Sequence, residues 1–313
     1  MEFKHKSVLL DECIENLNIR KNCVYVDGTL GGGGHSYHIL EALNGTGMLI
    51  GIDRDTDALV AASEKLKEFS NFKTVHDNHA NIKNILEDLE IPGVDGILLD
   101  LGVSSYQLDE ADRGFSYMHD AKLDMRMNRE DELSAYEVVN NYPEEKLFRI
   151  FVDYGEEKFS RSIARKICQR RIEKPIETTF ELVDIIKSAM PSKALNEKQH
   201  PAKRVFQAIR IEVNQELEKL KQAVEDSIIS LNDGGRLCII TFHSLEDKIV
   251  KHAYEEMEGR CTCPPDFPVC VCGYKSYGKI INKKPIVSSD KELEENPRAR
   301  SAKLRVFERI VKE

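Results

Sequence analysis

VYVDGTLGGGGH, residues 24–35, decides the fold of this chain. An apolar strand runs into Asp27, then into a loop with four consecutive glycines, then into residues suited to a helix. Glycine has no Cβ, so such a loop lets the backbone approach a ligand closely. A second apolar run, 48–52, ends in Asp53, and doubly wound folds hold a nucleotide ribose with a carboxylate at that point. The first sixty residues therefore predict a nucleoside cofactor.

The glycine loop also narrows the choice of cofactor. A dinucleotide fingerprint needs G-x-G-x-x-G, but the two possible frames end in Ser36 and Tyr37 instead of glycine. No Gly-Lys-Ser/Thr follows, so a phosphate-cradling P-loop is excluded as well. S-adenosylmethionine (SAM) suits the pattern, because it carries a ribose and a charged amino acid but no pyrophosphate. The alternative is a flexible turn with a solvated Asp53, and the strand on each side of the loop argues against it.

Strand and helix patterns alternate over the first hundred residues, which predicts an α/β fold with a doubly wound, mostly parallel sheet. The alternation stops after the strand at 96–100 and returns with a strand at 236–241 and a last one at 303–310. A helix at 204–231 is expected to restore the crossover of the sheet. We therefore expect a methyltransferase-type domain at 1–109 and 204–313, interrupted by an inserted helical domain at 110–203.

The composition is that of a soluble protein. The 313 residues are 41% hydrophobic and 32% charged, with a net charge of -9. No apolar run approaches the roughly 20 residues that cross a membrane, and the N-terminus does not resemble a signal peptide, so we expect a cytoplasmic protein without a membrane partner. Residues 158–210 hold 13 Lys and Arg against 5 Asp and Glu. This basic segment is a candidate phosphate-binding face, and a merely solvated helix surface is an equal alternative.

Seven short sequence motifs, which occur in the family's order and extend over almost the whole chain, show a resemblance to a known family. The chain resembles the bacterial 16S ribosomal RNA cytosine-N4 methyltransferases, long called the MraW family, which are class I SAM-dependent enzymes. The motifs are DGTLGGGGH at 27–35, DGILLDLGVSS at 95–105, RGFSY at 113–117, LDMRM at 123–127, FQAIRI at 206–211, TFHSLED at 241–247 and NPRARS at 296–301.

The resemblance implies a position for each part of the methyl donor. The amino-acid part of SAM would meet Gly33, Gly34 and His35 at the start of the predicted helix. The ribose would meet the carboxylate of Asp53, and adenine would lie against His79. Asp100 and Gln107 would complete the pocket. Two positions depart from the family: His79 replaces an aromatic residue, often Phe, and Tyr106 replaces Pro.

The resemblance also implies a substrate, a cytosine of 16S ribosomal RNA in the decoding region, methylated on N4, with the 30S subunit as the expected partner. It leaves the oligomeric state open, with a homodimer as one option. The N4 lone pair is delocalised into the ring, so the enzyme gains from alignment with the methyl donor and from an acceptor for the N4–H group. Asp100 and Ser104 are the candidates for that acceptor, and a turn-forming role is an equal alternative for Ser104.

Aromatic side chains near the pocket could stack a splayed base. Phe115, Tyr117 and Tyr106 are the candidates, with core packing the favoured role for Phe115. His243 follows the fifth expected strand and is either a substrate contact or a structural hydrogen bonder. Two other functions stay open: a DNA amino-methyltransferase and a non-catalytic nucleoside-binding regulator. DNA amino-methyltransferases usually have a Pro-Pro-aromatic motif after the fourth strand, and residues 101–103 of this chain, Leu-Gly-Val, do not match it.

Four of the eight cysteines fall within twelve residues. In a chain expected to be cytoplasmic, such clustering favours a metal over disulfides. The spacing C-x-C-x₆-C-x-C departs from the usual C-x₂₋₄-C of zinc sites, so free thiols in a surface loop are an equal alternative to a structural zinc. The candidate ligands are Cys261, Cys263, Cys270 and Cys272.

Overall fold

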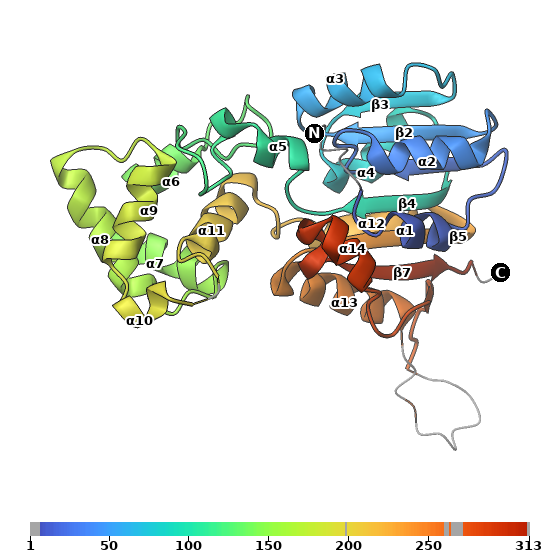
Figure 1. Ribbon diagram of the computed structural model, residues 1–313. Coiled ribbons are helices and arrows are strands. Elements are labelled where there is room, and N and C mark those ends of the chain that lie inside the picture. The colour runs from blue at the N-terminus through green and yellow to red at the C-terminus, as the bar shows by residue number, and fades with distance from the viewer. Residues whose placement is uncertain (1–6, 198, 260–262, 264–271, 312–313) are drawn as a thin grey trace. The chain divides into compact units, whose positions relative to one another are not determined.

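The computed structural model describes residues 7–197, 199–259, 263 and 272–311. The chain divides into two compact units. The first unit joins Met1–Gly102 to Leu217–Glu313, and the second is the continuous segment Val103–Glu216 (Figure 1). No helix in the described part of the chain has the length and apolar character needed to span a membrane.

The first unit is built on a seven-stranded sheet with the order β3-β2-β1-β4-β5-β7-β6. The first five strands in that order pair in parallel, whereas β7 is antiparallel to both β5 and β6. The predicted doubly wound, mostly parallel sheet is therefore confirmed, and the short strand β6 is the one that the sequence did not indicate. The strands are β1 (Val24–Asp27), β2 (Met48–Asp53), β3 (Phe72–His76), β4 (Val94–Asp100), β5 (Leu231–Thr241), β6 (Gly278–Ile280) and β7 (Lys303–Arg309).

Helices cover both faces of this sheet (Figure 1). Successive strand residues point to opposite faces, so neighbours in one strand belong to different apolar clusters: Tyr25 packs in one and Val26 in the other. Both faces are thus buried, as expected for parallel strands. The helices are α1 (Leu10–Leu17), α2 (Gly34–Leu43), α3 (Thr56–Lys65), α4 (Ile82–Asp88), α12 (Leu220–Ile229), α13 (Ser244–Glu258) and α14 (Asp290–Glu295), with 3-10 turns η1 (His79–Asn81) and η3 (Pro297–Ser301).

Segments far apart in the sequence meet at the start of α1. This helix begins at Leu10, and the side chain of its N-cap residue, Leu9, makes no capping hydrogen bond. Instead, the backbone N–H of Leu9 donates to Oε1 of Glu292 at 2.7 Å, and Glu292 is buried on α14. A residue near the end of the chain therefore completes a helix at its beginning.

The second unit is helical and has an apolar core of its own, formed by residues from Phe115 to Val213. Three of its helices begin with a capping box, at Ser104, Ser134 and Thr178, in which the cap and the third helical residue bond each other's backbone. Its elements are α5 (Ser105–Asp109), η2 (Ala111–Arg113), α6 (Ala135–Asn141), α7 (Glu144–Asp153), α8 (Ser160–Glu173), α9 (Thr179–Ser188), α10 (Ser192–Leu195) and α11 (Lys203–Asn214).

The expected helix at 204–231 is two helices that belong to different units. α11 ends at Asn214, where Gln215 takes a left-handed conformation with φ 51°, and α12 begins at Leu220. Asn214 holds α11 inside the helical unit: its side chain donates to the carbonyl of Met125 at 2.7 Å and accepts from the N–H of Met127 at 2.8 Å. The helical unit therefore extends beyond the insertion boundaries 110–203 at both ends.

Candidate functional site

The glycine loop lies between the end of β1 and the start of α2. Gly31 and Gly33 have positive φ angles, 49° and 70°, which glycine adopts without strain. A hydrogen bond to the end of β2 fixes the loop, because the N–H of Gly31 donates to Oδ2 of Asp53 at 2.8 Å. A Cβ on Gly32 would meet nothing within 4 Å. The loop is thus fixed by its bonds while the space beside its centre stays open.

Asp53 ends β2 and links this strand to the loop. One carboxylate oxygen accepts from Gly31, and the other accepts from the N–H of Asp55 at 2.9 Å. Burial raises the pKa of the Asp53 carboxyl to about 6, against the lowering effect of those two hydrogen bonds. Each oxygen keeps one lone pair for a further donor such as a ribose hydroxyl.

His35 lies in the first turn of α2 and is buried. Its Nε2 is 3.0 Å from the carbonyl of Val8, so Nε2 carries the proton and Nδ1 is an acceptor. Burial lowers the pKa of the His35 imidazole to about 4. The ring is therefore neutral at neutral pH. Gly34, directly before it, packs closely against Ser7, whose Oγ would lie 2.1 Å from a Cβ added to Gly34.

His79 begins η1 and packs against the first glycine after β1. A Cβ on Gly28 would lie 3.1 Å from Cβ of His79 and 2.4 Å from Cδ2 of Leu99, so position 28 has no room for a side chain. Burial lowers the pKa of the His79 ring to about 4. A neutral imidazole offers a flat face to a ring system such as adenine.

The carboxylate of Asp27, at the end of β1, forms its hydrogen bonds with other groups of the protein. It is 1% exposed, accepts from Oγ of Ser36 at 2.7 Å and accepts from the N–H of Thr29 at 3.2 Å. Burial raises the pKa of the Asp27 carboxyl to about 6. Asp27 therefore holds the start of the loop to α2, a role that its place at a strand end did not reveal.

Asp100 ends β4, next to β1 in the sheet, and its side chain differs from those of the other two aspartates. Its Oδ1 is buried and has no hydrogen-bond partner among the described residues, and its Oδ2 is 3.8 Å from Nδ1 of His35. Burial, together with the negative charges of Asp27 and Glu246, raises the pKa of the Asp100 carboxyl to about 8. The structure thus brings six predicted residues into the first unit around one sheet edge: Gly33, Gly34, His35, Asp53, His79 and Asp100.

Ser104 and Gln107 lie in the second unit. Oγ of Ser104 accepts from the N–H of Gln107 at 3.2 Å, and Oε1 of Gln107 accepts from the N–H of Ser104 at 3.0 Å. This capping box starts α5 and gives both side chains a structural role. The turn-forming alternative for Ser104 is therefore present in the structure.

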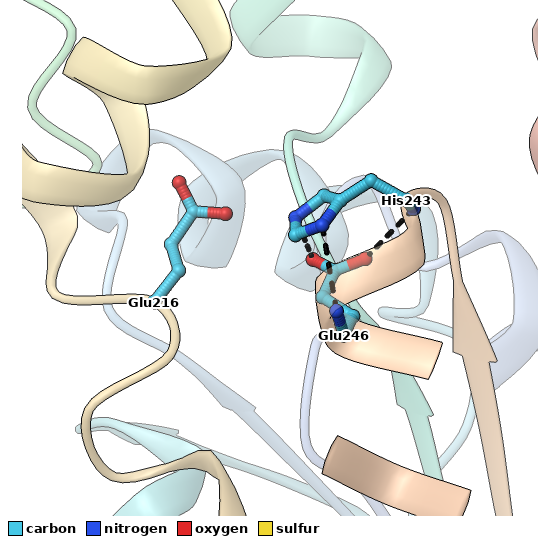
Figure 2. A group of neighbouring side chains, drawn as sticks. All are labelled: Glu216, His243 and Glu246. Carbon is cyan, nitrogen blue, oxygen red and sulfur yellow. Dashed lines mark hydrogen bonds and ion pairs between the residues drawn. The ribbon is translucent and has the colours of Figure 1, made fainter. Parts of the chain in front are cut away.

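His243 and Glu246 form a buried pair at the start of α13 (Figure 2). Nδ1 of His243 is 3.4 Å from the N–H of Glu246, and Nε2 is 3.0 Å from its Oε1. Oε2 of Glu246 accepts from the N–H groups of Phe242 at 2.9 Å and His243 at 3.3 Å. Glu216, also drawn in Figure 2, belongs to the second unit and there accepts from Arg210 at 2.8 Å.

Our sequence reasoning singled out His243 and missed Glu246. The signal was there, because His243-x-x-Glu246 before an apolar helix has the spacing of a capping box. The structure gives His243 the structural role that we had considered for it, as the cap of α13.

The basic segment at 158–210 is offset by acidic residues of the same unit. The second unit holds 19 Lys and Arg against 21 Asp and Glu. On α8, Arg161 lies 3.7 Å from Glu145 and Arg165 lies 3.8 Å from Glu144. Lys166 on the same helix is exposed and forms no ion pair with a described residue. The segment is therefore less basic in the fold than along the sequence.

The three aromatic candidates differ in exposure. Phe115 is buried in the core of the helical unit, as we favoured. The Tyr117 ring stacks on His200, with centroids 4.5 Å apart and an angle of 9°, and packs edge-on against Phe206. Tyr106 is 40% exposed. Tyr106 is thus the candidate with a ring face accessible within its unit.

Two of the four candidate zinc ligands, Cys261 and Cys270, lie outside the described residues. The predicted metal cluster is therefore not part of the described structure.

The comparisons with known proteins decide the family. A family model described as "MraW methylase family" matches residues 2–310. The chain belongs to this family. A curated relative from Clostridium botulinum (strain Loch Maree / Type A3), named ribosomal RNA small subunit methyltransferase H, is 64% identical over 310 residues, 99% of this chain and 100% of the relative. A relative of the same name from Lachnospira eligens is 60% identical over 311 residues, 99% of each chain.

Membership of the MraW methylase family confirms the resemblance shown by the seven sequence motifs. It also confirms that the chain is a methyltransferase. Solved structures are more distant: an rRNA methylase from Streptococcus thermophilus aligns over 98% of each chain with 11% identity and a TM-score of 0.43. The family assignment therefore rests on sequence, and the roles of individual residues in this MraW-family protein stay predictions.

Proposed function

We propose that this protein transfers the methyl group of SAM to N4 of a cytosine in 16S ribosomal RNA. The observation that carries the proposal is identity of 64% over the full length to proteins named ribosomal RNA small subunit methyltransferase H. The fixed loop and the carboxylates at one sheet edge support it, because ligands of doubly wound sheets bind beyond the carboxyl ends of the strands. We place the reaction in the cytoplasm, on the 30S subunit.

The residues of the first unit fit the donor. Gly33, Gly34 and His35 at the start of α2 would hold the amino-acid part, since a helix N-terminus attracts a carboxylate. Asp53 would accept hydrogen bonds from the ribose hydroxyls. His79 would lie against adenine, and Asp100 would complete the part of the pocket that this unit supplies. The open space beside Gly32 and the unpartnered oxygen of Asp100 are the features that a ligand of this size and charge would use.

The chemistry asks little of the protein beyond alignment and one acceptor. Bound SAM supplies an electrophilic methyl group on a sulfonium. The N4 amine of cytosine must be held in line with that group, and alignment of this kind supplies a large part of a rate enhancement. We assign the acceptor of the N4–H hydrogen bond to Asp100, because its Oδ1 has no partner among the described residues, whereas Ser104 caps α5. Accepting this bond draws the N4 lone pair out of conjugation, and the carboxylate then takes the proton that the methylated amine loses.

The second unit is our candidate for contacts with RNA. Tyr106 offers an exposed ring for stacking, and exposed lysines such as Lys166 would contact phosphates. The unit is close to neutral in total, so we expect a modest electrostatic contribution to RNA affinity.

We keep the structural zinc as a separate proposal, carried by the clustering of Cys261, Cys263, Cys270 and Cys272 in the sequence. Metal analysis of the purified protein tests it: one zinc per chain, lost when two of these cysteines are changed to Ser, supports the site. A metal-free protein with full activity contradicts it.

The deciding experiment measures transfer of labelled methyl from SAM to undermethylated 30S subunits, free 16S RNA and DNA, followed by nucleoside mass spectrometry. N4-methylcytidine from 30S subunits or 16S RNA is the expected product. N4-methylcytosine from DNA would favour the DNA amino-methyltransferase. SAM binding without transfer to any of the three would favour the non-catalytic regulator.

A further inference from the structure

Three aspartates end neighbouring strands of the first unit, and one of them is unlike the others. Asp27 and Asp53 use both carboxylate oxygens in hydrogen bonds to the loop and its surroundings. Asp100 has a buried Oδ1 without a partner among the described residues. A buried polar atom without a partner is costly, and such atoms are rare in folded proteins. Its presence at the proposed donor site points to a ligand that completes it.

The groups that face Asp100 do not supply a compensating charge. Asp27 on β1 and Glu246 on α13 are acidic, and Cys13 on α1 is a buried thiol. His35 on α2 lies 3.8 Å away but is neutral, because its Nε2–H bonds to a carbonyl and burial lowers its pKa to about 4. In the described part of the first unit, no lysine or arginine forms an ion pair with Asp100.

We propose that Asp100 distinguishes the methyl donor from the spent product by charge, being a neutral acid in the empty and product-bound site and a carboxylate only while a sulfonium is bound. This proposal rests on the proposed function. SAM carries a positive sulfonium, whereas S-adenosylhomocysteine (SAH) carries a neutral thioether of nearly the same shape. A carboxyl group without another counter-charge among the described residues responds to that difference.

The same coupling fits the proton balance of the reaction. SAM⁺ and the cytosine amine give SAH, the methylated amine and one proton: the S–CH₃ bond breaks, the N–CH₃ bond forms and the positive charge moves to nitrogen. While the sulfonium is present, it favours the carboxylate form of Asp100. Once the methyl group has left, Asp100 regains its high proton affinity, and it takes up the proton that the amine releases, directly or through water. Asp100 is thus a stronger base after the transfer than before it.

The direction of the pH dependence follows. In the empty site the pKa of Asp100 is about 8, so most molecules hold this proton at pH 7.5. An opposite charge within about 4–6 Å lowers a carboxyl pKa by about 1–3 units, so SAM binding at pH 7.5 releases roughly 0.7 proton. SAH binding releases none. From pH 7 to pH 8, where Asp27 and Asp53 are already ionised, SAM affinity therefore rises about three- to fivefold, while SAH affinity stays flat.

Titration calorimetry at pH 7.5, in two buffers with different ionisation enthalpies, tests the proposal by counting protons exchanged on binding. Asp27 and Asp53, with pKa values of about 6, are already ionised at this pH and do not contribute. The ligands are SAM, SAH and sinefungin, which carries an ammonium near the position of the sulfonium. The variants are Asp100→Asn, which keeps the shape but cannot ionise, and Asp88→Asn, an exposed carboxyl on α4, as the matched control.

The proposal expects proton release with SAM and sinefungin, none with SAH, and loss of the release in Asp100→Asn but not in Asp88→Asn. It also expects the preference of Asp100→Asn for SAM over SAH at pH 8 to fall about tenfold. Equal proton exchange with SAM and SAH, or release that persists in Asp100→Asn, overturns this inference and leaves the proposed function intact. Failure of the wild type to bind either nucleoside overturns both.

Discussion

The ligand-side strand ends of the first unit and the core of the second unit treat buried charge in opposite ways. In the first, Asp53 and Asp100 have raised pKa values, and no described cation pairs with either. In the second, Arg113 is 2% exposed and donates to the carbonyls of Arg126 and Met127 at 2.9 and 3.0 Å. There, burial alone would raise the pKa of Asp124, but hydrogen bonds from Arg126 hold it below its ordinary value.

This difference separates structure from function within one chain. Burying a charged group is unfavourable unless it is paired, so the pairs of the second unit are what a stable helical core requires. Acids with raised pKa values, gathered at a ligand-binding edge, are instead typical of functional sites. The comparison predicts that changes at these strand ends alter ligand binding, whereas changes in the core of the second unit alter stability.

The largest effect is expected at the ribose carboxylate. Asp53→Ala removes the proposed partners of both ribose hydroxyls and also frees the N–H of Gly31 from the loop. Losing two hydrogen bonds to a charged group weakens SAM binding about 100-fold. Equilibrium dialysis measures it, with Asp88→Ala on α4 as the control. Unchanged SAM affinity in a folded Asp53→Ala protein would remove Asp53 from the site.

The second unit provides the opposite case. Asn214→Ala leaves the carbonyl of Met125 and the N–H of Met127 buried without their partner. We expect the free energy of unfolding of this unit to fall by about 3 kcal/mol. Denaturant titration and hydrogen exchange at 125–127 measure the loss, and Asn141→Ala, an exposed position on α6, is the control. SAM affinity should stay within about twofold; a large loss of affinity would show that the units are not independent.

A smaller effect concerns pH and the stability of the ligand-free protein. Between pH 7 and 8, Asp100 is protonated in at least half of the folded molecules and ionised in the unfolded state, where its pKa is near 3.8. The folded state then binds more protons, so stability falls as pH rises, by at most about 1.4 kcal/mol per pH unit. His35 and His79 have the opposite effect and act mainly below pH 7, because folding lowers their pKa values from 6.5 to about 4.

Denaturant midpoints across pH 7–8 measure this slope. Asp100→Asn should flatten it, and saturating SAM should reduce it as well. A slope that survives in Asp100→Asn would place its origin in another group.

The smallest effect concerns RNA. Lys166→Gln removes one exposed charge from α8 that is not paired with a described residue. If it contacts a phosphate, the slope of log affinity against log salt for 16S RNA should decrease by about one. Lys83→Gln, an exposed lysine on α4 of the first unit, should leave the slope unchanged. An unchanged slope in Lys166→Gln would mean that Lys166 contacts no phosphate, and equal decreases in both variants would mean that the phosphate contacts are not confined to the second unit.

The sequence predicted the sheet well because its signals are local. Apolar runs that end in aspartate mark β1, β2 and β4, and glycines mark the loop. It could not predict β6, three residues long, or the break between α11 and α12, since both depend on distant partners such as β7 and Met125. Pairing between distant residues is not visible in a local pattern.

The site shows the same limit. Six of the predicted cofactor residues are brought together in the first unit, because strand ends of a parallel sheet share one edge. The sequence could not distinguish Asp27, which is fully bonded inside the protein, from Asp100, whose Oδ1 is not. It also overestimated the basic character of 158–210, because the glutamates that offset it on α7 lie outside that window.

The bond between Leu9 and Glu292 has a consequence for synthesis on the ribosome. The second unit is one continuous segment and can fold as soon as Glu216 has emerged, because its whole core lies between Phe115 and Val213. The sheet needs β7, and α1 needs Glu292, so both wait for the last residues of the chain. The unit that would bind the cofactor is therefore begun first and finished last, and a chain that stops before Glu292 would carry a folded helical unit on an incomplete catalytic one.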